Sequence, residues 1–210
     1  MGRPRALTHE TVIAAALSIS DSEGLPALTV RRLAEALDVT GMTLYTYFKN
    51  KHDLEQAVAD ALLERIPPPA LNAPDPATEL VEFFSQLYQL CIQHPSLISI
   101  FNAGPVLGPA AYRRTDAVLS LLRASGLSRA AAVQAHRAIT SWTLGFILLA
   151  SARQVDRNRN RNRHHRRPVQ DPKTYPALDD LGPLLAKHPT QAEFDDGLKR
   201  IIAAFVPAPS

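Results

Sequence analysis

The chain has 210 residues, 23 of them Lys or Arg and 20 Asp or Glu, and its formal net charge is +3 with histidine neutral. Its hydrophobic content of 46% excludes wholesale disorder, and its single cysteine, Cys91, excludes both an intramolecular disulfide and a cysteine-rich zinc site. The N-terminus lacks the apolar segment of a signal peptide, and the longest apolar stretch, residues 139–152, is too short to span a bilayer. We therefore expect a cytoplasmic protein with no membrane partner.

Apolar residues recur at helical spacing and no strand alternation is evident, which predicts an all-α protein of about ten helices. Thr8, Thr29, Thr40 and Asn50 precede helical patterns and are suited to cap helix N-termini. The first four helices are expected within residues 8–24, 29–37, 40–46 and 50–66. Five prolines between residues 67 and 76 mark a linker. It divides the chain into an N-terminal domain, 1–66, and a C-terminal domain, 67–210.

After the linker, helices are expected at residues 79–93, 109–124, 128–153, 176–186 and 190–205, with a short turn after Pro95. Pro183 should break or kink its helix, because proline cannot donate the helical hydrogen bond. Residues 153–167 carry seven arginines and one aspartate, a net charge of +6, whereas residues 1–66 have a net charge of −2. We expect 153–175 to be a flexible, solvated loop, and contact of its arginine-rich part, 157–167, with nucleic acid or another acidic partner is left open.

Residues 29–48 have the pattern of a helix-turn-helix. Ala34 is small where the two helices approach, Asp38 lies in the turn, and Val39 and Leu44 are apolar anchors. The second helix of this motif enters the DNA major groove, where hydroxyl, methyl and cationic groups contact bases and phosphates. The candidate DNA-binding residues are Thr29, Arg31, Thr40, Gly41, Met42, Thr43, Tyr45, Thr46, Tyr47, Lys49 and Lys51. A purely structural role in the core is the alternative for Tyr45 and, more strongly, for Phe48.

This segment resembles the TetR family of transcriptional regulators in the run Leu44-Tyr45-Thr46-Tyr47-Phe48-Lys49-Asn50-Lys51-x-x-Leu54. The resemblance covers residues 11–58 and implies a repressor that binds a palindromic double-stranded operator as a homodimer. Carried over by position, it assigns base and phosphate contacts to Arg31, Thr43, Tyr45, Tyr47 and Lys51. Asp38 stands where many members have glycine, which should strain the turn slightly.

Residues 138–146 and 193–205 are similar to the C-terminal domain of the tetracycline-repressor subclass, which binds a small molecule beside its long helix. The resemblance makes 1–66 the DNA-binding domain and 67–210 the ligand-binding and dimerisation domain. It implies a pocket wall of Phe83, Gln86, Leu87, Leu90, Cys91, His94, Phe101, Thr140, Trp142, Thr143 and Phe146. Ordinary core packing is the alternative for each wall residue, and for His94 a helix-end position satisfied by the backbone is favoured. Ile66 and Pro67 replace a drug-contacting histidine of that repressor, and Phe83 replaces an asparagine. We therefore expect a more apolar, aromatic effector than a magnesium-chelated drug.

An operator with two half-sites requires a two-fold dimer. The best candidates for the dimer interface are the helix at 128–153, whose second half is apolar nearly all round, and the helix at 190–205. The second of these has an apolar stripe of Phe194, Leu198, Ile201, Ile202 and Phe205. Packing inside one protomer is the alternative for both helices.

No catalytic motif is found: the sequence has no G-x-S-x-G, phosphate-binding loop, H-E-x-x-H or G-x-G-x-x-G. We expect no enzyme activity, no cofactor and no metal site, since Cys91 and His94 alone are too few ligands. The alternative function is a ligand-independent DNA-binding or architectural protein. That alternative predicts a filled C-terminal core, whereas an effector-responsive regulator predicts a cavity beside Trp142.

Overall fold

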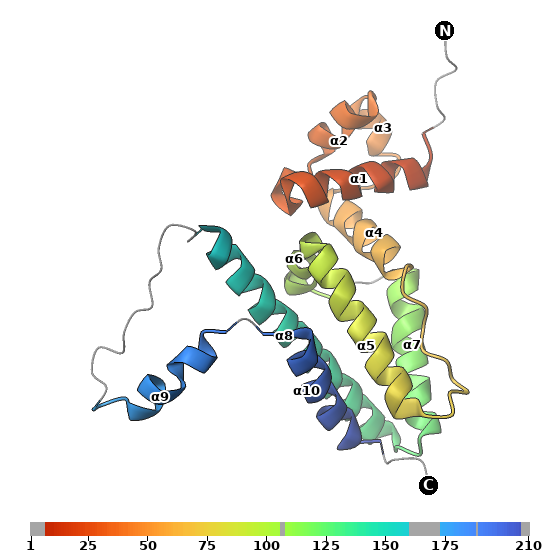
Figure 1. Ribbon diagram of the computed structural model, residues 1–210. Coiled ribbons are helices and arrows are strands. Elements are labelled where there is room, and N and C mark those ends of the chain that lie inside the picture. The colour runs from red at the N-terminus through yellow and green to blue at the C-terminus, as the bar shows by residue number, and fades with distance from the viewer. Residues whose placement is uncertain (1–6, 106–107, 160–172, 188, 207–210) are drawn as a thin grey trace.

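The computed structural model describes residues 7–105, 108–159, 173–187 and 189–206. Within these ranges it contains ten α-helices, one short 3₁₀-helix and no strand, which confirms the predicted all-α class. The head consists of α1 (His9–Glu23), the 3₁₀-helix (Leu25–Ala27), α2 (Val30–Leu37), α3 (Gly41–Leu44) and α4 (Lys51–Leu63). The rest consists of α5 (Pro76–Gln93), α6 (Pro95–Ala103), α7 (Pro109–Ala124), α8 (Arg129–Arg159), α9 (Pro176–Leu185) and α10 (Gln191–Ala203). Figure 1 shows the head at one end of a body formed by α5 to α8 and α10.

The predicted caps fix the helices of the head. The side chains of Thr8, Thr29 and Asn50 accept backbone N–H bonds at the starts of α1, α2 and α4. Thr40 precedes α3 as predicted, but its side chain makes no capping bond, because its hydroxyl pairs with that of Thr43 instead. Asp38 ends α2 in the left-handed conformation, with φ of 55°, so it takes the position where many relatives of this pattern carry glycine. Its side chain stays exposed to solvent, and the turn between α2 and α3 closes as the sequence predicted.

Two helices differ from the prediction near proline. Helix α5 starts at Pro76, three residues early, because the Asp75 carboxylate accepts bonds from the backbone N–H groups of Ala77 and Thr78. Helix α6 occupies nine residues where the sequence indicated only a turn after Pro95. Both prolines are at the first helical position, where the missing N–H has no partner to lose.

The C-terminal region corrects two further predictions. Helix α8 continues to Arg159, so the loop expected to begin at residue 153 does not begin there, and residues 160–172 lie outside the described ranges. Helix α9 runs through Pro183 without a break. Pro183 is in the last turn of an exposed helix, where only one hydrogen bond is lost and the carbonyl left without a donor can reach water.

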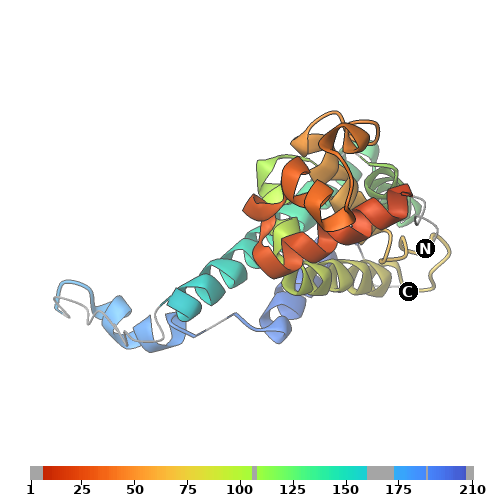
Figure 2. The same ribbon diagram turned by 90° about the horizontal axis from the view of Figure 1, so that it is seen from above.

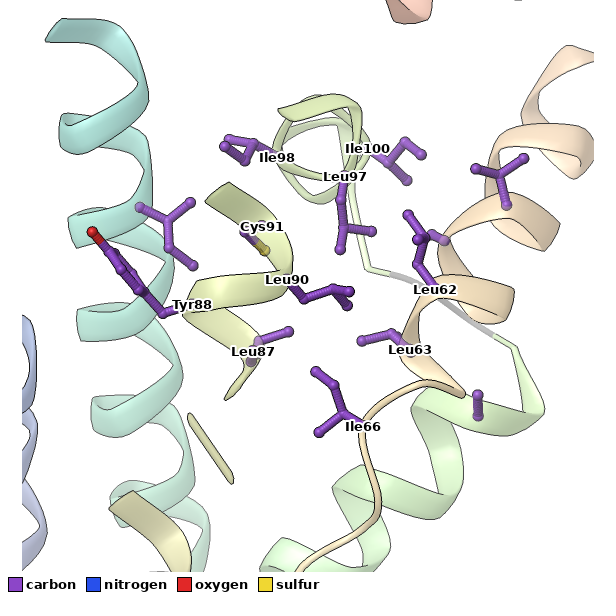
Figure 3. Close-up of a cluster of buried hydrophobic side chains, with 14 of the residues drawn as sticks. Leu62, Leu63, Ile66, Leu87, Tyr88, Leu90, Cys91, Leu97, Ile98 and Ile100 are labelled. Atoms are coloured by element: carbon purple, nitrogen blue, oxygen red, sulfur yellow. The ribbon is translucent and has the colours of Figure 1, made fainter. Parts of the chain in front are cut away.

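The hydrophobic core runs without interruption from the head into the body. Figure 3 shows Leu90 of α5 and Leu97 of α6 pointing toward Leu62 and Leu63 of α4. All four side chains are buried. Helix α4 therefore belongs both to the head and to the body, and a shift of α5 or α6 would move it.

The second half of α8 and the whole of α9 project away from the body (Figure 2). No residue of α9 is buried, and four of its leucines are exposed at positions 178, 181, 184 and 185. Leu148 and Leu149 of α8 are exposed as well. Among the residues that the structure describes, nothing covers these apolar side chains.

Candidate DNA-reading head and effector cavity

Helices α2 and α3 expose polar and apolar side chains at the end of the head farthest from the body (Figure 1). Arg31 is 90% exposed and pairs with Glu35, with 3.0 Å between Nε and Oε1. Met42 and Tyr45 of the α3 region are 77% and 52% exposed. Arg31, Gly41 and Tyr45 line one hollow between the two helices. This surface can contact base edges because donors, a thioether and an aromatic ring meet on it.

The four candidate threonines of the head already form hydrogen bonds within the protein. Thr29 caps α2, the hydroxyls of Thr40 and Thr43 lie 3.0 Å apart, and Thr46 donates to the Thr43 carbonyl over 2.6 Å. Each hydroxyl oxygen retains a free lone pair, since a hydroxyl can accept two bonds. All four are near the outer surface and remain candidates for DNA contacts.

Tyr47 and Phe48 differ from their exposed neighbours. Tyr47 is partly buried, and its hydroxyl donates to the Leu7 carbonyl over 2.7 Å. Phe48 is 6% exposed and belongs to the core, which the sequence favoured for this residue. Lys49 and Lys51 are exposed at the start of α4, with Lys51 Nζ 3.6 Å from Glu55 Oε1. The two amines are therefore placed where DNA phosphates could reach them.

A cavity of about 460 Å³ lies in the body between α5, α6, α7 and α8, directly below the end of α4. Its wall is mostly apolar. The lining residues are Leu63, Phe83, Phe84, Leu87, Phe101, Gly104, Pro105, Ala111, Arg114, Thr115, Val118, His136, Thr140 and Leu144. Four of the predicted pocket residues, Phe83, Leu87, Phe101 and Thr140, line it.

The other predicted pocket residues do not line this cavity. Gln86 and Leu90 face a separate hollow of about 360 Å³ beside Arg65. Cys91 is fully buried, which raises the pKa of its thiol to about 12. Thr143 is also fully buried and donates to the Ile139 carbonyl over 2.9 Å. Both residues belong to the packed core.

Trp142 and Phe146 belong to an aromatic cluster between α5, α8 and α10. Phe146 lies 5.6 Å from Trp142 and 5.4 Å from Phe194, measured between ring centroids, and Tyr88 stacks on Phe194 at 4.5 Å. The cavity described above does not lie beside Trp142, where the sequence led us to expect one. The cavity is on the other side of α8, because α10 fills the space next to Trp142.

His94 has a role that the sequence did not indicate. Its Nδ1 lies 2.9 Å from a carboxylate oxygen of Asp21 in α1, and its Nε2 lies 3.2 Å from Nη1 of Arg65. This polar contact joins the head to the start of α6 and does not face the cavity. Among the described residues, no group of three or more His, Cys, Asp or Glu side chains could hold a metal ion.

Arg114 and His136 are the ionisable cavity residues that sequence reasoning missed. Arg114 is 4% exposed and occupies a position of α7 flanked four residues away by buried Ala110 and Val118. A cation inside such an apolar stripe is the signal that could have been used. His136 stands on α8, one turn before Thr140, and burial, with the charge of Arg137, lowers the pKa of its imidazole.

Comparison with known proteins gives the family. Residues 12–58 match the bacterial regulatory proteins of the tetR family, and residues 68–205 match the tetracyclin repressor-like C-terminal domain. The chain belongs to the TetR family. It is thus a DNA-binding transcriptional regulator with a helix-turn-helix head and a ligand-binding C-terminal domain.

Two relatives and one solved structure cover nearly the whole of this TetR-family chain. An HTH-type transcriptional regulator of Saccharopolyspora erythraea is 27% identical over 94% of this chain and 84% of its own length. The class E tetracycline repressor of Escherichia coli is 30% identical over 95% and 90%. ActR of Streptomyces coelicolor, solved in complex with actinorhodin, aligns with a TM-score of 0.83 and 26% identity, over 96% of this chain and 97% of ActR.

The stripe predicted as a dimer interface of this TetR-family member is largely inside the protomer. Phe194, Leu198 and Ile202 are at most 1% exposed, because that face of α10 packs against α5 and α8. For these three residues the prediction is wrong. Ile201 and Phe205 are only partly buried and can still reach a partner. In the described part of the chain, no helix is both long and apolar enough to cross a membrane.

Proposed function

We propose that this TetR-family chain represses transcription as a homodimer in the cytoplasm and that a small, largely apolar effector bound in the cavity releases it from its operator. The cavity of about 460 Å³ carries the proposal. It supports an effector-responsive regulator over a ligand-independent architectural protein, which should have a filled core. The relatives of this chain are regulators and its sequence has no catalytic motif, so we propose that it has no enzyme activity.

In this proposal α3 enters the major groove of a palindromic operator. Arg31, Met42 and Tyr45 contact base edges, and Lys49 and Lys51 hold phosphates. The remaining candidates around them are Thr29, Thr40, Gly41, Thr43, Thr46 and Tyr47. In the dimer the two copies of α3 lie about 34–36 Å apart, one turn of DNA.

The dimer is proposed to form through the exposed face of α8 together with α10. Ser141 and Gly145 are small and exposed, and they allow a second helix to approach closely. Leu148 lies on the same face, exposed at 45%, and Ile201 and Phe205 add apolar area from α10. Covering these side chains removes apolar surface from water, which favours association.

The effector is proposed to act through α4. The cavity touches α4 at Leu63, and α4 is packed against α5 and α6 by the buried cluster of Figure 3. A ligand that spreads the helices around the cavity would tilt α4 and change the separation of the two reading helices. It must bind the DNA-free state more tightly than the DNA-bound state, or it shifts nothing.

The neighbour ActR supports the kind of ligand. It has been solved with actinorhodin and with (S)-DNPA, at TM-scores of 0.83 and 0.81. In the present chain the cavity wall holds three phenylalanines, from α5 and α6. Such a wall fits an aromatic molecule, since most of the surface it offers is apolar.

The decisive test is selection of operator DNA from a random double-stranded pool by the full chain, followed by titration of variants. Tyr45→Ala should weaken binding to the selected operator by about 1–3 kcal/mol, the usual value of a specific base contact. Tyr112→Ala is the matched control, because Tyr112 is similarly exposed, at 58% against 52%, but lies on α7 outside the head. Equal losses for the two variants, or no selected sequence, would contradict the DNA-reading assignment.

The dimer has its own test. Leu148→Glu should reduce the mass measured by sedimentation from dimer toward monomer and should weaken operator binding as well, since two half-sites are then no longer bound together. Leu71→Glu is the control, because Leu71 is exposed in the linker between α4 and α5, away from α8. A Leu148→Glu protein that sedimented as a dimer would rule out this face.

A further inference from the structure

Arg114 is a buried cation on the wall of the cavity. Its side chain is 5% exposed, and it projects from α7 among apolar residues. Nη1 donates to the Ala110 carbonyl over 2.9 Å and Nη2 donates to the carbonyl of Ile66. Nε is buried and has no hydrogen-bond partner. A buried, unpaired donor on a charged group is costly, so a ligand that supplies the acceptor gains binding energy from it.

The charge of Arg114 is only partly balanced. Two carboxylates outside the cavity wall act on it: that of Glu64, whose Oε2 lies 3.6 Å from Nη2, and that of Asp60. Glu64 is half exposed and also pairs with Arg113. The described residues that line the cavity include no Asp or Glu. The interior of the cavity therefore offers positive charge to whatever occupies it.

The other polar groups on the wall fit the same ligand. His136 faces the cavity from α8, and burial lowers the pKa of its imidazole, which favours the neutral form that both donates and accepts. Thr115 and Thr140 add hydroxyls. Phe83 and Phe84 meet edge to face at 5.1 Å and form an apolar wall on α5. Polar donors and aromatic walls thus meet in one cavity.

We propose that the effector of this protein is an aromatic acid whose carboxylate or phenolate binds the guanidinium of Arg114. The inference rests on the proposed function, because it names the chemical class of the ligand for that same cavity. Charge-assisted hydrogen bonds to arginine are stronger than neutral ones, and the surrounding apolar wall strengthens them further. An uncharged molecule of the same shape can offer only a neutral acceptor to the guanidinium, and that hydrogen bond is weaker.

A pair of probes tests the acid group. Anthracene-2-carboxylate and anthracene-2-carboxamide have almost the same shape and differ in charge, and their binding to the full chain can be measured by calorimetry at pH 7.5. We expect the carboxylate to bind at least tenfold more tightly. Equal affinities, tighter binding of the amide, or no binding of either probe would overturn the proposal.

Variants assign the preference to Arg114. In Arg114→Leu the advantage of the carboxylate should disappear, and in Arg114→Lys part of it should return. Arg113→Leu is the matched control, because it removes an adjacent arginine that shares Glu64 but does not line the cavity. A preference for the carboxylate that survived in Arg114→Leu, or was lost equally in Arg113→Leu, would overturn the assignment.

A second variant avoids disturbing the bonds between Arg114 and the end of α4. Thr115→Glu adds a carboxylate at the cavity wall and should weaken binding of the carboxylate probe at least tenfold, with the amide within threefold of the parent value. An unchanged affinity for the carboxylate would count against the proposal. These results do not affect the test of the proposed function, in which the parent chain selects an operator. If only the amide bound, the cavity would still be a ligand site, but the proposal of an acidic effector would be wrong.

Discussion

The two faces of helix α8 differ in what lies against them. Trp142 and Phe146 face α5 and α10 and are packed into the aromatic cluster. His136, Thr140 and Leu144, three or four residues apart on another face, line the cavity. The residues of both faces recur at the same spacing, so periodicity alone cannot separate them. The two faces differ in what packs against them. Helix α10 fills the space beside Trp142 and Phe146, whereas the helices opposite His136, Thr140 and Leu144 leave the cavity.

The largest effect on stability is expected where α10 packs against α5 and α8. Phe194→Ala should lower the free energy of unfolding by about 3–5 kcal/mol, since it removes a fully buried ring that stacks on Tyr88. Leu144→Ala, on the cavity face, should cost clearly less because part of its surface already borders empty space. Urea unfolding of both variants measures the contrast, and equal losses would mean that the two faces are packed alike.

Gly197 on α10 gives the next effect. A Cβ at this position would overlap the Trp142 indole ring, so Gly197→Ala should destabilise the protein by about 1–3 kcal/mol through overpacking. Gly182→Ala on α9 is the control, as no atom lies within 4 Å of its Cβ position. There, alanine should be neutral or stabilising by up to about 1 kcal/mol. If Gly197→Ala had the same thermal unfolding midpoint as the parent chain, the Trp142 ring would move aside freely and the prediction would be wrong.

Filling the cavity should have little effect on stability and a large effect on binding. Leu144→Phe should change the free energy of unfolding by less than about 1 kcal/mol, because the added atoms enter empty space, yet it should abolish binding of both anthracene probes. Ile139→Phe, on the fully buried face, should cost about 1–3 kcal/mol. Unfolding curves and calorimetry decide, and undiminished probe binding to Leu144→Phe would place the ligand elsewhere.

The smallest expected effect is a pH dependence from His136. Burial lowers the pKa of this imidazole below its usual value near 6.5, so the unfolded chain binds the proton more readily than the folded chain. Well above pH 6.5 the imidazole is neutral in both states and does not reduce the stability of the folded chain. As the pH falls from there toward the lowered pKa, the free energy of unfolding declines. His136→Gln should flatten that part of the stability curve, as measured by unfolding between pH 5 and pH 8. An identical slope in parent and variant would assign it to other groups.

Local signals were sufficient for the head. Caps at Thr8, Thr29 and Asn50 and the turn at Asp38 are where the sequence predicted them, because each depends on contacts within a few residues. Phe48 is buried as predicted too, although its ring packs against His9, far away in the sequence. The corrections near Pro95 and Pro183 have the same local nature. Proline is compatible with a first helical position and tolerable in a last turn, and a pattern rule that treats it only as a breaker misses both.

The sequence by itself determined the family and the all-α class, and it supplied the head residues that we propose to contact DNA. Tertiary structure decided which apolar stripes are filled: it placed Phe194, Leu198 and Ile202 inside the protomer and moved the cavity from Trp142 to Arg114 and His136. The reason is physical. Helical spacing reports which face of a helix is apolar, but whether that face meets a ring, a gap or a second protomer depends on residues far away in the chain.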